Sequence, residues 1–281
     1  MKQQGIALIQ VLLIVAVLSV LAMYFTHTAR NQVQIAQWLD DKNTALVNLH
    51  NTESELLFLL LTELKGNQSK NNTIKWNFYN QPFTMHESVV VSMQDQAGLL
   101  SAHFPDVELL NKLVASSGIA PGVNFSSLLL DWQDLDNEPR PRGKETKQTR
   151  NGKIPHLQDL VHLKALSEQG YKILQNNMSI YRTGYYNPMA SPVSLLRALT
   201  NNEKAQKGLD LRNNDELNKR AFKELTGLSE NDSMFFYPSN NIAIKIKSTV
   251  GESVAEKEII ITLSPYAVLD VSPIVVMYNR G

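Results

Sequence analysis

Residues 5–25 read GIALIQVLLIVAVLSVLAMYF, an apolar run without a charged side chain. About 20 apolar residues are needed for a helix to cross a bilayer. A cleavable signal peptide has a shorter apolar core, about 7–15 residues, followed by a cleavage site of small residues. Residues 23–27, MYFTH, are a poor match to such a site, and the absence of cysteine excludes a lipoprotein signal. The sequence therefore predicts a transmembrane segment over residues 6–26, in the simplest case an uncleaved single-pass anchor.

The helix is expected to continue well beyond the membrane. No glycine or proline occurs between Ile6 and Lys65, and Gly66 stands where a C-terminal cap is expected. Apolar residues recur at helical spacing after the membrane segment. They are Val33, Ile35, Leu39, Leu46, Leu49, Leu56, Leu60 and Leu64. The pattern predicts one helix over residues 6–66, about 90 Å long, whose second half packs against the rest of the chain.

A short polar leader that ends in glycine before such a helix resembles the N-terminus of type IV pilins and pseudopilins. The resemblance implies that a prepilin peptidase cuts after Gly5 and methylates Ile6. Most pilins carry glutamate at the fifth mature position, which pairs with a neighbouring subunit. Here that position is Gln10. Either this subunit lacks the pairing, or Gln10 is one tolerated polar residue in a membrane anchor.

Charge bears on the partners of the chain and on its orientation in the membrane. The 281 residues include 27 basic and 27 acidic side chains, so the formal net charge is zero. A neutral chain gives no electrostatic reason to bind nucleic acid. Lys2 favours a cytoplasmic N-terminus, although Arg30 on the other flank acts against this rule. We therefore expect a single-pass membrane protein whose bulk lies outside the cytoplasm, and the resemblance implies the inner membrane with the C-terminal head in the periplasm.

After the helix, strand-like segments enclose a helical region. Residues 73–78 and 83–93 read as strands, as do residues 241–250, 257–263 and 272–278, with a hairpin turn at residues 251–253. Helices are expected after Asp106, from Leu157 and after the Ser191-Pro192 pair, and over residues 214–226. The fold class is therefore α+β, a pilin-like long helix with an antiparallel sheet that is interrupted by a large all-helical insertion. The expected units are a leader at 1–5, the helix at 6–66, the head at 67–104 and 233–281, and the inserted domain at 105–232.

This order resembles the minor pseudopilin K family of the type II secretion system. The family carries a D-W-x-D-x-D-x-x-P-R segment, here residues 131–140, and a Pro-led helix, here from Ile154-Pro155. The family also typically lacks the fifth-position glutamate. Two features depart from the pattern. Residues 100–102, LSA, replace an N-x-N motif, and residues 144–147, KETK, replace an acidic stretch that contains tyrosine.

No catalytic motif was found, so an enzyme is not expected. The polar cluster with a possible binding role is the acidic loop. Its carboxylates are Asp131, Asp134, Asp136 and Glu138. Carboxylates in a loop can supply oxygen ligands for Ca²⁺, and the resemblance adds that pseudopilin heads often bind calcium. The alternative is a solvated loop whose charge is balanced by Arg140 and Arg142.

The leading hypothesis is a minor pseudopilin that caps and initiates the periplasmic pseudopilus of type II secretion. The resemblance implies a tip complex with the other minor pseudopilins (I, J and H), the major pseudopilin as a further partner, processing by prepilin peptidase, and no nucleic-acid partner. A minor pilin of a type IV or DNA-uptake pilus is the alternative, and a membrane-anchored periplasmic enzyme is a third class.

Overall fold

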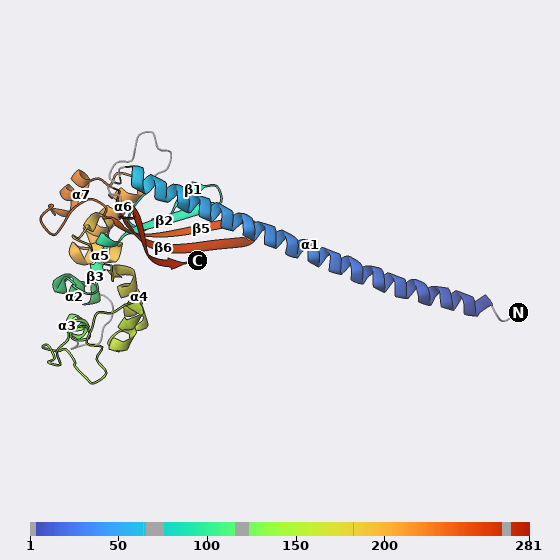
Figure 1. Ribbon diagram of the computed structural model, residues 1–281, viewed down its shortest axis with the longest axis horizontal. Coiled ribbons are helices and arrows are strands. Elements are labelled where there is room, and N and C mark those ends of the chain that lie inside the picture. Colours follow the sequence, from blue (N-terminus) through green and yellow to red (C-terminus); the bar gives the residue numbers. More distant parts are fainter. Residues whose placement is uncertain (1–3, 64, 66–75, 116–123, 182, 266–270) are drawn as a thin grey trace.

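The computed structural model describes the chain except for residues 1–3, 64, 66–75, 116–123, 182 and 266–270. Helix α1 runs from Gln4 to Thr62 without a break, which confirms the long N-terminal helix. Its length is about 88 Å at 1.5 Å per residue. Most of the helix projects away from a head formed by the rest of the chain (Figure 1). The expected cap at Gly66 lies outside the described residues.

Only the last part of α1 packs against the head. Ala45, Leu49, Leu56 and Leu60 are buried there at helical spacing. Within this chain the apolar stripe does not pack from Val33 onward. The early stripe residues are exposed, namely Val33, Ile35, Leu39 and Leu46.

The physical reason is the reach of the sheet. Its hairpin end contacts α1 at Trp38, whose carbonyl accepts a hydrogen bond from Ser253 Oγ at 3.2 Å, and at Lys42, which donates to the Val254 carbonyl. Val33 and Ile35 come before this point and have no sheet beside them. Leu39 and Leu46 come after it, and they are exposed because they lie on a side of α1 that the sheet does not cover.

The head is built on one antiparallel sheet with the strand order β1-β2-β5-β6-β7. The strands are β1 (Phe83–His86), β2 (Val89–Asp95), β5 (Asn241–Val250), β6 (Ser253–Leu263) and β7 (Ile274–Arg280). Side chains alternate between the faces. In β5 the isoleucines at 242, 244 and 246 are buried against α1, whereas Lys245 and Lys247 pair across the outer face with glutamates of β6.

Two of the strand predictions need correction. The segment expected as one strand over residues 83–93 is a hairpin, because the chain turns at Glu87 and Ser88. In the expected strand at 73–78, residues 73–75 lie outside the described part, and residues 76–78 are not in a strand. Trp76 and Phe78 are nevertheless buried, and they cover the sheet near β2. The backbone N–H of Asp95 donates to the Phe78 carbonyl at 3.0 Å.

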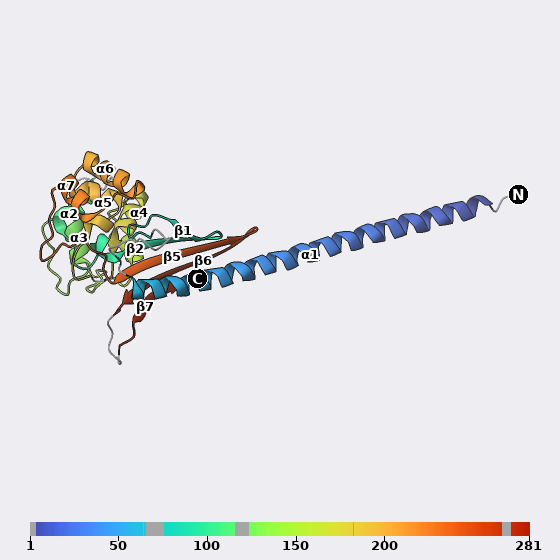
Figure 2. The same cartoon turned by 90° about the horizontal axis from the view of Figure 1, so that it is seen from above.

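A large segment is inserted between β2 and β5, which are direct neighbours in the sheet. It therefore spans residues 96–240, a wider range than the expected 105–232. The helices are α2 (Val107–Ala115), α3 (Phe125–Asp131), α4 (Glu168–Asn177), α5 (Val193–Leu199), α6 (Asn202–Asn213) and α7 (Lys219–Thr226), with 3-10 turns η1 (Gln96–Gly98), η2 (Leu157–Leu163) and η3 (Pro188–Ala190). The insertion is not entirely helical, because β3 (Leu100–Ser101) and β4 (Met178–Ser179) pair in parallel. Figure 2 shows the inserted helices at the end of the molecule opposite the N-terminus of α1.

Some of the inserted helices match the expected signals, and others differ. The helix expected over residues 214–226 begins only at Lys219. Asp106 caps α2, as expected, through a 3.0 Å bond from the Leu109 N–H, and Gly227 ends α7 with a φ of 78°. Helix α6 was not predicted, since its sequence is mostly polar and it buries small residues such as Ala205. The helix expected from Leu157 is the 3-10 helix η2, and the α-helix of this region, α4, begins later, at Glu168.

The two ends of the insertion meet at the buried carboxylate of Asp95. Its Oδ1 accepts hydrogen bonds from the Ala97 N–H (2.9 Å) and the Ser239 hydroxyl (2.5 Å). Its Oδ2 accepts from Asn187 Nδ2 (2.9 Å) and the Ser239 N–H (3.1 Å). Burial raises the pKa of Asp95, and these hydrogen bonds oppose the shift. Asp95 thus ties together the exit from β2, the return to β5 and the turn before η3.

Lys65 lies beside this junction, and its titration predicts a pH dependence of stability. Its ammonium group donates to the Ser239 carbonyl (2.7 Å) and to Asn240 Oδ1 (2.6 Å). Burial lowers the pKa of Lys65 to about 8, although the Asp95 charge opposes the shift. The unfolded chain keeps this proton up to about pH 10.4. The native state therefore binds fewer protons in this window, and the Lys65 contribution to the free energy of unfolding rises with pH between about 8 and 10.4.

A Lys65→Met variant keeps the aliphatic stem and removes the titration. We expect the wild type to gain up to about 3 kcal/mol relative to this variant across the window. Denaturant unfolding of both proteins at several pH values measures the difference. Parallel stability curves would contradict the expectation.

Candidate functional site

The acidic loop begins at the C-terminal end of α3. Asn124 caps this helix by accepting a hydrogen bond from the Ser127 N–H at 3.3 Å. The cap fixes where the helix starts, and its last residue, Asp131, is fully buried. A buried carboxylate is costly unless it is paired and hydrogen-bonded.

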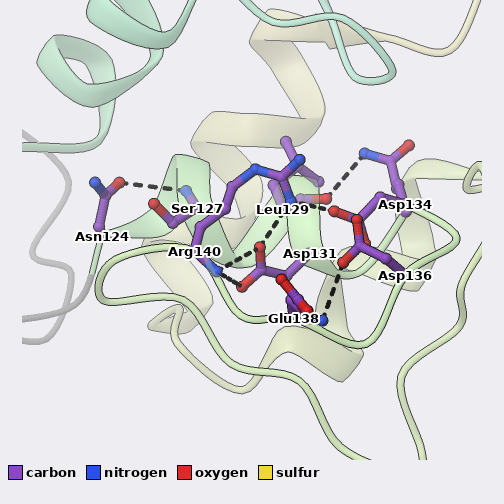
Figure 3. A network of polar contacts seen from close by, with 9 residues as sticks. Asn124, Ser127, Leu129, Asp131, Asp134, Asp136, Glu138 and Arg140 are labelled. Atoms are coloured by element: carbon purple, nitrogen blue, oxygen red, sulfur yellow. Dashed lines mark hydrogen bonds and ion pairs between the residues drawn. The ribbon is translucent and has the colours of Figure 1, made fainter.

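Arg140 is the partner that holds the loop closed. Its Nη1 donates to Asp131 Oδ1 at 2.8 Å and also to Asp134 Oδ2, so the guanidinium lies between the two carboxylates (Figure 3). The Arg140 N–H contacts both Asp131 oxygens at 3.3 and 3.2 Å. The hydrogen bonds to Asp134 and then Asp131 raise the pKa of Arg140. The loop is therefore an ordered, charge-paired turn.

A third carboxylate, from Glu145, joins the two aspartates. One oxygen from each of Asp131, Asp134 and Glu145 lies within 4.8 Å of the others. Asp134 Oδ1 and both oxygens of Glu145 are buried and have no hydrogen-bond partner among the described residues. Burial, followed by the charges of Asp134 and Asp131, raises the pKa of Glu145. Such unpaired, converging oxygens fit a hard divalent cation, and flexible oxygen coordination is the preference of Ca²⁺.

Gly143 makes room for this cluster. A Cβ placed there would lie 1.9 Å from Asp131 Oδ2, so any side chain would displace the buried carboxylate. The Gly143 N–H also donates to the Arg140 carbonyl at 2.8 Å. This turn brings Glu145 back toward the end of α3.

The structure brings together two of the four predicted calcium ligands. Asp131 and Asp134 are in the cluster, whereas Asp136 and Glu138 are exposed and outside it. The Asp136 carboxylate instead accepts the Glu138 N–H at 3.0 Å, which stabilises a local turn (Figure 3). Glu145 was missed because it lies in the KETK stretch that departs from the family pattern. The sequence signal that could have identified Glu145 as a further ligand is that it is an acidic residue in the same loop.

The residues with a predicted role in processing and assembly lie in the first turns of α1. Gly5 and Ile6 are within the helix, and Gln10 is exposed on it. In the described chain α1 is the one helix long and apolar enough to span a membrane. Its apolar side chains from Leu8 to Phe25 are exposed. This exposure fits a single-pass membrane anchor.

Comparison with known proteins gives a structural match. No model of a known protein family matches the chain, and no curated protein matches it. The chain is similar to a chain in the crystal structure of the GspK–GspI–GspJ complex from the type 2 secretion system of enterotoxigenic Escherichia coli. The TM-score is 0.53 at 15% identity, and the match covers 90% of this chain and 98% of that chain. The likeness shows a shared fold, and the expected fold class is confirmed.

Proposed function

We propose that this protein is a K-type minor pseudopilin of the type II secretion system, which caps and initiates the periplasmic pseudopilus. The proposal is carried by three features that occur together. Helix α1 is long enough to span a membrane, a pilin-like sheet packs on its far end, and a large segment is inserted between the paired strands β2 and β5. The structural match, which covers 90% of this chain and 98% of the matched chain, supports the proposal. The role is mechanical, and we propose no catalytic activity.

The exposed apolar half of α1 suits the inner membrane, with the head in the periplasm. By analogy with the matched complex, the proposed partners are the I- and J-type minor pseudopilins. The resemblance noted in the sequence adds the H-type minor pseudopilin and the major pseudopilin to the proposed partners. The formal net charge of zero favours protein partners over nucleic acid.

Two features support a terminal position in the filament. A subunit with Gln10 in place of a glutamate lacks the carboxylate that would pair with a subunit above it. The inserted domain adds bulk at the end of the molecule far from the membrane (Figure 1). Both features oppose further stacking past this subunit.

The position predicts a labelling pattern. In cells that assemble pseudopili, the labelled chain is expected at one end of each filament. Gln10→Glu combined with a short turn in place of residues 96–240 should weaken the restriction to the end. Immunogold counting along sheared filaments measures the distribution. A uniform distribution of the unaltered chain would show that the terminal assignment is wrong.

Processing at the leader predicts a defined mature chain. The mature protein is expected to begin at Ile6 and to carry a methylated amine. Intact mass of the membrane-extracted protein tests this, and a bulky Gly5→Leu substitution should leave residues 1–5 in place. Retention of Met1 in a strain with active prepilin peptidase would contradict the prediction.

A further inference from the structure

A cleft lies between the insertion and the outer face of the sheet. Its volume is about 820 Å³, which is within the range of protein ligand pockets. The roof comes from the end of α4, the start of α5 and one side of α6, and the floor comes from β2, β5, β6 and β7. Helix α1 packs on the other face of the sheet. The cleft is therefore a surface separate from the one that holds the long helix.

The floor of the cleft crosses four strands. Gln94 of β2 lies opposite Ala243 of β5, and Ile260 of β6 lies opposite Tyr278 of β7. Ala243 and Ile260 also lie opposite each other, so the four side chains form one row on the outer face. Strands are about 4.8 Å apart, which makes the row about 14 Å long. An extended chain rises about 3.3 Å per residue, so four to five residues cover this distance.

The charges that line the cleft are unbalanced. A second row crosses the floor beside the first, and it consists of Lys245, Glu258 and Arg280. Arg212 of α6 adds a third permanent cation, whereas Glu258 is the one acidic side chain among the described residues that line the cleft. Because the whole chain has a formal net charge of zero, this positive surplus is local, and it favours an acidic ligand.

Arg212 is a buried cation without an acidic partner among the described residues. It is 3% exposed, and its Nη2 donates to the carbonyls of Met189 (2.9 Å) and Ser191 (2.7 Å), which fastens α6 to the turn before α5. Its Nε is buried and has no hydrogen-bond partner in the described part of the chain. Burial lowers the pKa of Arg212 to about 10, and the effects that oppose this shift come from Tyr79 and Tyr186, not from a carboxylate. A buried cation of this kind has much to gain from a carboxylate that a ligand supplies.

Amide side chains supply much of the neutral lining. Eight of the lining residues are Asn or Gln. An amide both donates and accepts hydrogen bonds, so a lining of amides suits the N–H and C=O groups of a peptide backbone. Gln158 and Asn176 are exposed, and within the described residues their side chains have no hydrogen-bond partner. These amides are therefore available to a ligand in the cleft.

From the length, charge and lining of this cleft we infer that it binds a short extended segment of another polypeptide through acidic side chains. Arg212 takes one carboxylate, because a guanidinium group binds carboxylates with a planar, directed geometry. Lys245 and Arg280 attract a further acidic side chain, and the amides bind the backbone of the segment. A small anion on Arg212 would leave most of the 14 Å row uncovered. The inference does not depend on the proposed function.

Two pools of capped hexapeptides test the inference on the detergent-solubilised full chain. The pools share four randomised positions, and they differ at two fixed positions, which are glutamate in one pool and glutamine in the other. The immobilised protein is expected to retain the glutamate pool at least tenfold more than the glutamine pool at low salt, because only the glutamate pool offers carboxylates to the three cations. Mass spectrometry of the retained peptides measures the ratio.

Substitutions in the cleft show where the peptides bind. Lys245→Gln is expected to reduce retention of the glutamate pool at least threefold. Lys247→Gln is the matched control and should leave retention within twofold, because Lys247 lies on the same face of β5 and also pairs with a glutamate of β6, but is outside the cleft. Arg212→Lys keeps a positive charge and loses the guanidinium geometry, and it should reduce retention at least tenfold. If circular dichroism shows that this buried variant does not fold, Lys245→Gln and the exposed Arg280→Gln decide the test.

Three results would overturn the inference. The first is equal retention of the glutamate and glutamine pools. The second is retention of the glutamate pool that stays the same in the cleft variants and in Lys247→Gln, which would place the binding elsewhere. The third is retention of a pool of soluble peptidoglycan fragments in place of the peptides, which would show a glycan-binding cleft. Each of these results leaves the proposed function intact, because that function is tested by the position of the chain in filaments.

Discussion

Asp95→Ala is expected to lower the free energy of unfolding of the head by about 3 kcal/mol, because it leaves several buried donors without an acceptor. For a unit of this size the loss corresponds to a fall in Tm of about 9 °C. The donors are the N–H groups of Ala97 and Ser239, the Ser239 hydroxyl and the Asn187 amide. Thermal unfolding of the detergent-solubilised full chain, followed by circular dichroism, measures the change.

A helix cap provides the control for this variant. Asp106→Ala removes one hydrogen bond, to the Leu109 N–H at the start of α2, and is expected to cost about 1 kcal/mol. If Asp95→Ala costs no more than this cap, the carboxylate does not organise the junction.

Calcium is expected to raise the Tm of the unaltered chain, and chelation should lower it again. A cation that binds only the native state adds about 2.7 kcal/mol at a hundredfold excess over its Kd. Glu145→Gln is expected to abolish this response, because its two buried oxygens would supply ligands. Calorimetry with calcium and with chelator measures both effects.

The direction of the Glu145 pKa shift predicts a second effect of Glu145→Gln, on stability in the absence of calcium. The pKa is raised in the folded chain, so without a cation the ionised carboxylate destabilises the fold, and stability falls as the pH rises above the ordinary value. Under chelation, Glu145→Gln should therefore be more stable than the unaltered protein, although it loses the response to calcium. The exposed Asp136→Asn serves as the matched control and should respond normally. An unchanged melt of the unaltered chain with and without calcium would reject the site.

Helix α1 and the strands β5, β6 and β7 could be predicted because their sequence signals are local. Helix α1 follows from an uninterrupted apolar and amphipathic run. Strand β5 follows from isoleucines at every second position, 242, 244 and 246, with lysines at 245 and 247, and the expected range 241–250 is the observed one. The burial of the α1 stripe could not be predicted in the same way. It depends on how far the β5–β6 hairpin reaches down the helix, and that distance is a tertiary property. Helix α6 could not be predicted from periodicity, because it packs through small residues instead of an apolar stripe.

The acidic cluster, too, could be predicted only where its signal is local in the sequence. The aspartates at the end of α3 form a dense cluster in the sequence, so Asp131 and Asp134 were identified. Which other carboxylates join them depends on the turn made by Arg140 and Gly143, which brings Glu145 into the cluster and leaves Asp136 in solvent. Chain reversals of this kind are set by side-chain pairing across the loop, which spacing alone does not reveal.

The insertion between β2 and β5 also has a consequence for the order of folding. Pairing these strands directly would close a loop of roughly 145 residues, at an entropic cost of about 4 kcal/mol from its length alone. Contacts of such long sequence separation form slowly. If the inserted segment folds first, its ends already lie together at Asp95 and Ser239, and the sheet closes as a local step. We expect the β5–β6 hairpin to form early, because its contacts are local, and to pair with β2 once the folded insertion has brought the two strands together.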